Sequence, residues 1–319
     1  MRFTAVVTTA AVALALAGCS STKQQSSAEY FAAANDSFRT GALEAAIDQY
    51  HDLLDQHPFS EHSEEAELKI AHAYYLAGAY PEAVVALTDF QRRHPTSPHL
   101  PFVGYYLGMC YVRQMNTVDR DQTAARNAHT YFLTLTRQYP DSPFAELGRE
   151  RLTECRERLA GHDLYVANFY SKRENYRAAE VRLLTLASRY QETPAAADAL
   201  LELGSYYSSH NMQEQAALAY LALIDSQPKS PNAPRAAEAL ASLPTNLPTA
   251  GEGDPLDALL AANGRRRSPL DVEPIRVPDL AGSRQPQPGL AGGPGGAFGQ
   301  GGGPFGGSAS SPFGRGRGY

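Results

Sequence analysis

The residue whose surroundings point most directly to covalent chemistry is Cys19. Only one charged residue, Arg2, precedes it, and the apolar run that follows ends in the tetrapeptide LAGC, residues 16–19. A short basic start, an apolar stretch too short for a comfortable membrane span and small residues before a cut are typical of a secretory signal peptide. The pattern predicts a signal peptide over residues 1–18, with a nucleophilic thiol directly behind the cleavage point.

The LAGC segment resembles the lipobox of bacterial lipoproteins. In that family the cysteine sulfur receives a diacylglycerol, the signal is removed before it, and the new amino group is acylated. The resemblance implies lipidation at Cys19, a polar tether over residues 19–27 and export to the outer membrane, since Ser20 rather than Asp follows the cysteine. The alternative is an N-terminal helix in which the cysteine is a small buried apolar residue.

The nine histidines form no catalytic or metal-binding pattern. No pair has metal-ligand spacing with carboxylates nearby, and four of them flank the segments PFSE and PTSP, which indicate solvated turns. No G-x-S-x-G, P-loop or dinucleotide-binding motif occurs in the folded part. We therefore expect a protein that is not an enzyme and that uses no metal or other cofactor.

Cys110 and Cys155 each lie on an apolar helical stripe. A disulfide between them is compatible with an oxidising compartment, but it would need their Cα atoms within about 7 Å of each other. Buried free thiols are favoured over a bridge, and both alternatives stay open at this point.

The elements that carry these residues repeat along the chain. Four strings, IAHAY, LGMCY, VANFY and LGSYY, place a small residue three positions before a tyrosine, on the same face of a helix. An alanine and then a helix-ending proline follow, in most repeats at intervals of twelve, and the basic period of 37 residues indicates a stacked helical solenoid. The anchors, repeat by repeat, are Ala34, Ala46 and Pro58; Ala71, Ala83 and Pro95; Gly108, Ala128 and Pro140; Ala167 and Ala179; Gly204, Ala216 and Pro228.

Two insertions interrupt this period. About eight extra residues fall between the two helices of the third repeat, around residues 113–122, and about 14 precede the fourth repeat. The second insertion predicts a lengthened or additional amphipathic helix. Its apolar residues at helical spacing are Leu147, Leu152, Cys155 and Leu159.

The anchor positions, turns such as GAYPEA and the closing prolines resemble the tetratricopeptide repeat. The resemblance implies an all-α fold, a right-handed superhelical solenoid of about five helix pairs over residues 28–242, with a concave inner groove. A helical bundle with coincidental spacing is the alternative. Residues 243–319 are rich in glycine and proline, which predicts a disordered tail.

Longer segments resemble a narrower family. HPTSPHLPFVGYYLGMCY, DRDQTAARNA, YPDSPF and VANFYSKRENYRAA are similar to the BamD (ComL) family of outer-membrane β-barrel assembly lipoproteins, over about residues 27–240. That family also has a loop before DRD and a long helix after YPDS. The tail has no counterpart in the family pattern.

The resemblance to this family implies a lipid-anchored periplasmic scaffold of the β-barrel assembly machinery. Its partners would be unfolded outer-membrane proteins at the first two repeats, a BamA-like protein at the last repeats and other assembly lipoproteins. The expected substrate contacts are Tyr75, Arg92 and Arg93, and the expected docking contact is Arg182. Alternatively, Arg182 is only a solvated charge on a helix, and Tyr75 only packs against neighbouring helices.

Charge excludes one class of partner. The net charge is −6 and only 19% of residues are charged, so no global basic field exists to hold nucleic acid. The arginine run at 265–267 and the GRGRGY end would suit an anionic surface, although such composition is also typical of a solvated linker. Two other functions stay open: an adaptor for division, motility or peptidoglycan attachment, and, ranked last, an enzyme with an unrecognised site.

Overall fold

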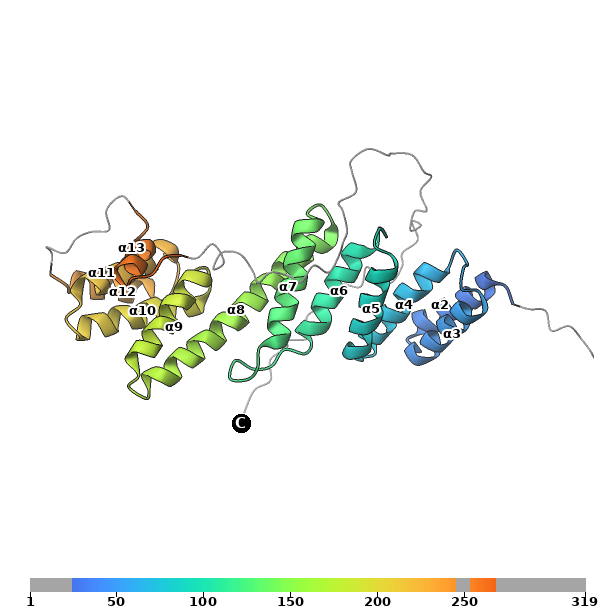
Figure 1. Cartoon of the computed structure of the whole chain (residues 1–319), viewed down its shortest axis with the longest axis horizontal. Helices are drawn as coiled ribbons and strands as arrows, with labels where there is room; N and C mark the ends of the chain where they lie inside the picture. The colour runs from blue at the N-terminus through green and yellow to red at the C-terminus, as the bar shows by residue number, and fades with distance from the viewer. Residues whose placement is uncertain (1–24, 245–252, 268–319) are drawn as a thin grey trace, which may run out of the picture. The chain divides into compact units, whose positions relative to one another are not determined.

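The computed structural model describes residues 25–244 and 253–267, and every regular element in these ranges is an α-helix. The predicted signal peptide, Cys19 and much of the predicted tail lie outside these ranges. The chain divides into two compact bodies, an N-terminal body up to Ala77 and a C-terminal body that begins at Gly78. Figure 1 labels the helices of both bodies. Among the described residues, no helix combines the length and the apolar character that crossing a membrane requires.

The N-terminal body consists of α2 (Ser27–Thr40), α3 (Leu43–Gln56) and α4 (Ser63–Leu76), and α3 packs against both of the others. A capping box begins α2: the Ser26 hydroxyl accepts a hydrogen bond from the Glu29 N–H, and the Glu29 carboxylate accepts one from the Ser26 N–H at 2.7 Å. The helix ends at Gly41, whose φ of 81° is a left-handed conformation that glycine adopts without strain.

In the described part of the C-terminal body, each helix from α5 to α12 packs against the next one, and α13 packs against α11. They are α5 (Tyr80–Arg93), α6 (Leu100–Val112), α7 (Thr123–Gln138), α8 (Pro143–Ser171), α9 (Tyr176–Arg189), α10 (Pro194–Ser209), α11 (Gln213–Ser226), α12 (Ala233–Ala241) and α13 (Pro255–Ala262). Contacts also join α6 to α8 and α8 to α10, as expected where helix pairs stack side by side. The predicted all-α class of consecutive helix pairs is confirmed for the described residues.

The small positions of the repeats are buried, as predicted. Those of repeats two to five are Ala71, Gly108, Ala167 and Gly204. A Cβ added to Gly108 would lie 2.5 Å from the ring of Phe132 on α7, and one added to Gly204 would lie closer still to the ring of Tyr220 on α11. Glycine occurs at these two positions because an aromatic ring from the second helix of the same repeat occupies the space.

Both insertions take a definite form in the structure. Residues 113–122 connect α6 to α7, and the second insertion lengthens α8, which is one continuous helix of 29 residues rather than two. Ser142 caps α8 by accepting a hydrogen bond from the Phe144 N–H at 3.2 Å. Because α8 contacts α6, α7, α9 and α10, it joins the third repeat to the fourth and fifth.

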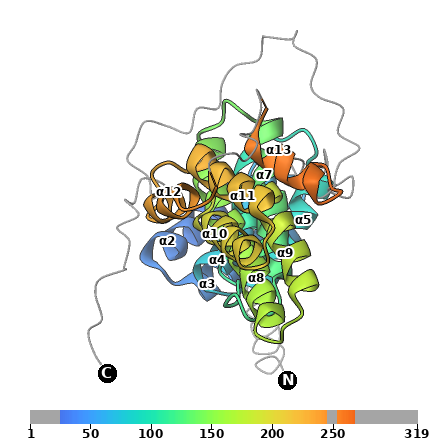
Figure 2. The same ribbon diagram turned by 90° about the vertical axis from the view of Figure 1, so that its left-hand side faces the viewer.

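The prediction of a disordered tail is wrong for residues 253–267, because this segment folds onto the C-terminal body. Helix α13 packs against α11 (Figure 2), and its leucines 256, 259 and 260 are buried in the core of this body. Asp254 caps the helix by accepting a hydrogen bond from the Leu256 N–H at 2.8 Å. The three leucines give this short segment an apolar stripe, which α11 buries despite the glycine- and proline-rich composition of its surroundings.

Candidate partner-binding sites

Tyr75 lies on α4 in the N-terminal body, where its side chain is half-buried. Its ring stacks on that of His72, with centroids 6.5 Å apart and an interplanar angle of 20°. His72 is buried next to Phe38, and burial together with the charge of Lys69 lowers the pKa of His72 to about 4. The imidazole is therefore neutral at pH 7, and Tyr75 packs on it while keeping part of its surface in solvent.

Arg92 and Arg93 lie in the last turn of α5, in the C-terminal body, with exposed side chains. Arg92 donates a hydrogen bond to Asp89 at 2.8 Å. Cations at this end of a helix offset the partial negative charge of the last carbonyl groups, and an exposed pair of this kind contributes about 0–1 kcal/mol. Because Tyr75 belongs to the other body, the three predicted substrate contacts are not part of one described site.

Arg182 is exposed on α9 and belongs to a basic surface to which α7 and α8 also contribute. Burial raises the pKa of Asp163 on α8, and nearby positive charges oppose that rise. These charges belong to Arg189, Arg182 and Arg126. We refer to Arg126, Asp163, Arg182 and Arg189 together as the Arg182 surface.

The Arg182 surface carries an excess of positive charge. Asp121 pairs with Arg126 at 3.6 Å, and Asp163 interacts with all three arginines. Arg182 itself has no hydrogen bond or ion pair with any residue that the structure describes. An exposed guanidinium without a direct partner is suited to a polypeptide that presents carboxylates.

The loop of residues 113–122 holds the middle of α8 next to this surface. The carbonyl oxygen of Val118 lies 2.6 Å from His162 Nδ1, and the carbonyl oxygen of Asn116 accepts a hydrogen bond from Arg158 at 3.2 Å. Both contacts fall within two turns of Asp163 along α8. The insertion that interrupts the repeat period therefore anchors the helix segment that carries Asp163.

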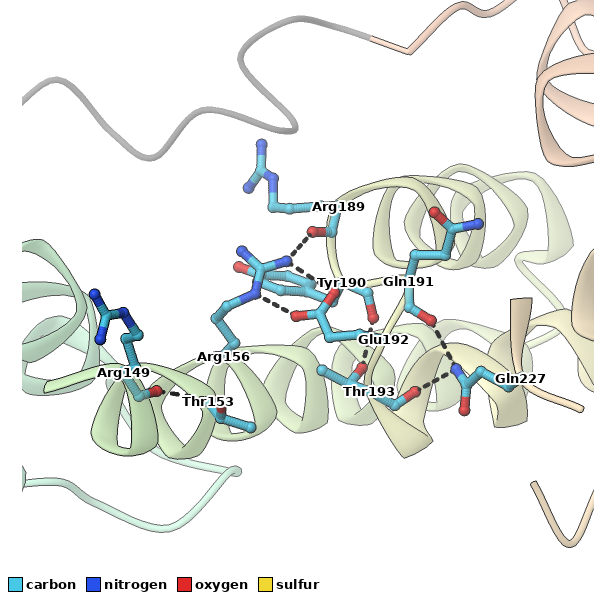
Figure 3. A network of polar contacts seen from close by, with 9 residues as sticks. All are labelled: Arg149, Thr153, Arg156, Arg189, Tyr190, Gln191, Glu192, Thr193 and Gln227. Carbon is cyan, nitrogen blue, oxygen red and sulfur yellow. Dashed lines mark hydrogen bonds and ion pairs between the residues drawn. The ribbon is translucent and has the colours of Figure 1, made fainter. Parts of the chain in front are cut away.

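A network of polar contacts holds the turn that follows Arg189 (Figure 3). Arg156 of α8 forms an ion pair with Glu192 and donates a hydrogen bond to the Arg189 carbonyl oxygen at 2.7 Å. Its guanidinium carbon lies 5.2 Å from the centre of the Tyr190 ring. Gln227, the C-cap residue directly after α11, donates to two further carbonyl oxygens of the same turn, at 2.7 and 2.8 Å. Side chains from α8 and from the C-cap of α11 thus fix the end of α9 that carries Arg189.

Cys110 and Cys155 are buried free thiols, so the alternative without a bridge is confirmed. Burial raises the pKa of each thiol to about 12, and a protonated thiol is a poor nucleophile. Within the described ranges, no group of three or more His, Cys, Asp or Glu side chains is placed to hold a metal ion.

The family of the chain follows from a comparison with known sequences. Residues 23–221 match the YfiO family model, whose description is outer membrane lipoprotein, and this match covers more than half of the chain. The chain belongs to the YfiO family. The match ends within α11, so α12 and α13 lie beyond the family model.

Relatives of this YfiO-family chain share one name, outer membrane protein assembly factor BamD. The relative from Caulobacter vibrioides is 27% identical over 213 residues, which are 64% of this chain and 70% of the relative. The one from Neisseria gonorrhoeae is 27% identical over 246 residues, or 71% and 92% of the two chains. The one from Vibrio cholerae is 29% identical over 189 residues, or 56% and 78%. The predicted BamD family is confirmed.

Proposed function

We propose that this chain is an outer-membrane protein assembly factor, a scaffold that helps β-barrel proteins insert without catalysing a reaction. One observation carries the proposal: the family match runs through both bodies, from residue 23 to residue 221, and relatives across several bacteria bear that name. Stacked helix pairs offer extended surfaces to other polypeptides, which suits a scaffold.

In this proposal, lipid on Cys19 holds the scaffold at the periplasmic face of the outer membrane. Residues 1–18 act as the signal peptide and residues 19–27 as the tether. Each buried CH₂ group adds about 0.8 kcal/mol, so a terminus that carries several acyl chains is a strong anchor. The tether also raises the effective concentration of both bodies near partners in the same membrane.

The Arg182 surface is the proposed docking site for the periplasmic part of a BamA-like β-barrel protein. Support comes from its excess of positive charge, from the absence of a direct partner for Arg182 among the described residues, and from the contacts that hold α8 and the end of α9. The backbone that carries these arginines loses little conformational entropy on binding, because α8 and the end of α9 are already held in place.

Arg182→Glu tests this docking site, with Arg177→Glu as the matched control. Arg177 is exposed on the same helix, five residues earlier and hence on another face. We expect Arg182→Glu to weaken copurification of a BamA-like protein with the full-length lipoprotein about tenfold, and the control to leave it unchanged. Equal retention by both variants would contradict the docking site. Copurification of a cell-wall enzyme in place of a BamA-like protein would favour an adaptor for another envelope process.

Tyr75, Arg92 and Arg93 are the proposed contacts for unfolded outer-membrane proteins. A photo-crosslinking amino acid at position 75 should capture newly exported barrel proteins, whereas the same amino acid at the exposed neighbour Leu76 should capture few. In a separate test, Arg92→Gln together with Arg93→Gln should weaken copurification of unfolded barrel proteins with the full chain. Equal yields at positions 75 and 76 would show that the contact is not specific to this face of α4.

A further inference from the structure

A pocket of about 290 Å³ lies where the end of α8 meets α9 and α10 in the C-terminal body. Tyr176 and Glu180 of α9 and Glu202 and Tyr206 of α10 line it, together with leucine, alanine and serine side chains. None of the described residues that line the pocket is a lysine or an arginine. The pocket therefore carries two carboxylates with no cation in its lining.

The aromatic part of the lining is preformed. The rings of Tyr176 and Tyr206 are stacked, with centroids 5.5 Å apart and an interplanar angle of 26°. The His210 ring lies 4.2 Å from Tyr206 and 5.9 Å from Tyr176, so it supports both tyrosines. Tyr176 keeps 41% of its surface exposed, which leaves ring area for a ligand. The face of such a ring attracts a cation.

Neutral hydroxyl groups hold the two carboxylates in place. The Tyr207 hydroxyl donates a hydrogen bond to Glu180 at 2.8 Å, and the Ser171 hydroxyl donates one to Glu202 at 2.8 Å. Neither glutamate forms an ion pair with any described residue. Burial raises the pKa of Tyr206 and Tyr207, and the charge of Glu180 raises both further, as expected for a locally negative site.

This combination selects one kind of ligand. A guanidinium group is flat, stacks on tyrosine faces and donates several hydrogen bonds to carboxylates, whereas an ammonium group is a strongly hydrated point charge. The volume is just below the range of about 300–1,000 Å³ typical of small-molecule sites, so it suits one side chain. We propose that the pocket formed by Tyr176, Glu180, Glu202 and Tyr206 binds an arginine side chain of a partner polypeptide.

This site is separate from the docking surface of the proposed function and opposite to it in charge. Arg182 and the pocket residues Tyr176 and Glu180 lie on the same helix, α9. A partner that engaged both would present carboxylates to the Arg182 surface and an arginine to the pocket. Complementary charges of both signs fix the orientation of a partner more strongly than either sign alone.

The direct test is ¹⁹F NMR of the full mature chain with 3-fluorotyrosine at position 206. The probes are N-acetyl-arginine methylamide and N-acetyl-citrulline methylamide, which have nearly the same shape and differ in charge. We expect a saturable shift of the Tyr206 resonance with the arginine probe and none with the citrulline probe. Equal shifts with both probes, or no shift with either, would overturn the proposal.

Glu180→Gln combined with Glu202→Gln removes both charges and keeps an oxygen acceptor for the Tyr207 and Ser171 hydroxyls. The matched control replaces Glu214 and Glu238, which are exposed on α11 and α12, by glutamine and changes the net charge equally. We expect binding of the arginine probe to weaken at least tenfold in the pocket variant and to stay unchanged in the control. The same loss in both variants would show that only net charge matters, which contradicts a specific pocket.

A third variant tests whether the occupant is the chain itself. Replacing Arg315 and Arg317 by glutamine in the full chain should leave the Tyr206 resonance where it was before any probe is added. A shift in that variant would identify the C-terminal end of this chain as the occupant and overturn the assignment to a partner. The measurement follows binding alone, so its failure would not affect the proposed role in barrel assembly, which is tested by barrel levels in cells.

Discussion

Gly108 lies where the second helix of its own repeat places an aromatic ring. A Cβ at this position would lie 2.5 Å from the fully buried ring of Phe132, so one neighbour would have to move. We expect Gly108→Ala to lower the free energy of unfolding by about 1–3 kcal/mol, because overpacking in a closed interior forces side chains or backbone out of place. Urea denaturation followed by circular dichroism measures the change.

Gly104, one turn earlier on α6, is the matched control. A Cβ there would find Leu135 at 3.8 Å, which is ordinary van der Waals contact. Alanine is favoured over glycine within a helix by up to about 1 kcal/mol, so Gly104→Ala should leave stability equal or slightly higher. Equal destabilisation by the two variants would mean that the close contact with Phe132 does not explain the glycine at 108.

His72 makes the stability of the N-terminal body depend on pH. Its pKa is about 4 in the folded chain, against about 6.5 when unfolded. Above pH 6.5 the His72 imidazole is neutral in both the folded and the unfolded chain, so it does not change the free energy of unfolding. As the pH falls from 6.5 to 4, the imidazole takes up a proton only in the unfolded chain, and the free energy of unfolding therefore falls. The loss is about 2–3 kcal/mol over that window.

The variant His72→Gln isolates this contribution. Unfolding free energies measured at several pH values between 7 and 4 should fall less steeply in the variant than in the parent chain, by close to one proton in slope. Identical slopes would indicate that the imidazole becomes protonated without unfolding, and hence that burial does not keep it neutral.

At the scale of the elements, the stability of α13 depends on its packing against α11. An isolated helix of eight residues is not stable in water, and three buried leucines hold this one against α11. Arg265, just beyond its end, donates hydrogen bonds to the Val181 carbonyl and the Thr185 hydroxyl of α9, each at 3.3 Å. The segment is therefore tied to two helices of the fifth and fourth repeats.

Leu259→Ala should release α13 from this surface. Truncating a buried leucine costs about 2–5 kcal/mol, more than a short peripheral helix retains. Hydrogen–deuterium exchange of peptides that cover residues 253–267 should become at least tenfold faster, while the exposed control Ala261→Ser should exchange like the parent chain. Unchanged protection in the leucine variant would mean that packing on α11 is not what orders the helix.

Repeat spacing predicts the helix pairs and the two insertions, because buried small residues recur wherever neighbouring helices approach closely. It does not distinguish a lengthened helix from an additional one, since Leu152, Cys155 and Leu159 have the same spacing in both. Helix α13 is not predicted when composition is averaged over the whole of residues 243–319. The local string DPLDALLAAN nevertheless contains a capping aspartate and a stripe of leucines, which are typical of a short helix. Short signals are lost where the averaging window is longer than the element.

The candidate sites are harder to predict than the helices. Of the Arg182 surface, only Arg182 follows from the family resemblance, because Arg126 and Asp163 come from other helices and no motif relates the three positions. The pocket between Tyr176 and Tyr206 likewise depends on which faces of α9 and α10 meet. Periodicity assigns residues to faces of one helix, but the pairing of faces is decided by packing.

At the scale of the whole molecule, the proposed scaffold reaches its partners only when lipid on Cys19 attaches it to the membrane. Cys19→Ala removes the thiol that would carry the lipid, so the chain should disappear from the outer-membrane fraction. Ser20→Asp is the matched control: it keeps the thiol and should keep the lipid, but it should leave the protein in the inner membrane. Fractionation with immunoblotting, and mass spectrometry of the N-terminal peptide, measure both. A Cys19→Ala chain that remained in the outer membrane would contradict lipid anchoring.

The central claim, that this chain assembles outer-membrane proteins, is tested most directly by depleting it and quantifying the outer-membrane proteome. We expect β-barrel proteins to fall together, several-fold, while lipoproteins of the same membrane keep their levels, and we expect the parent chain to restore the barrels. Barrel levels that stayed unchanged after full depletion would contradict it.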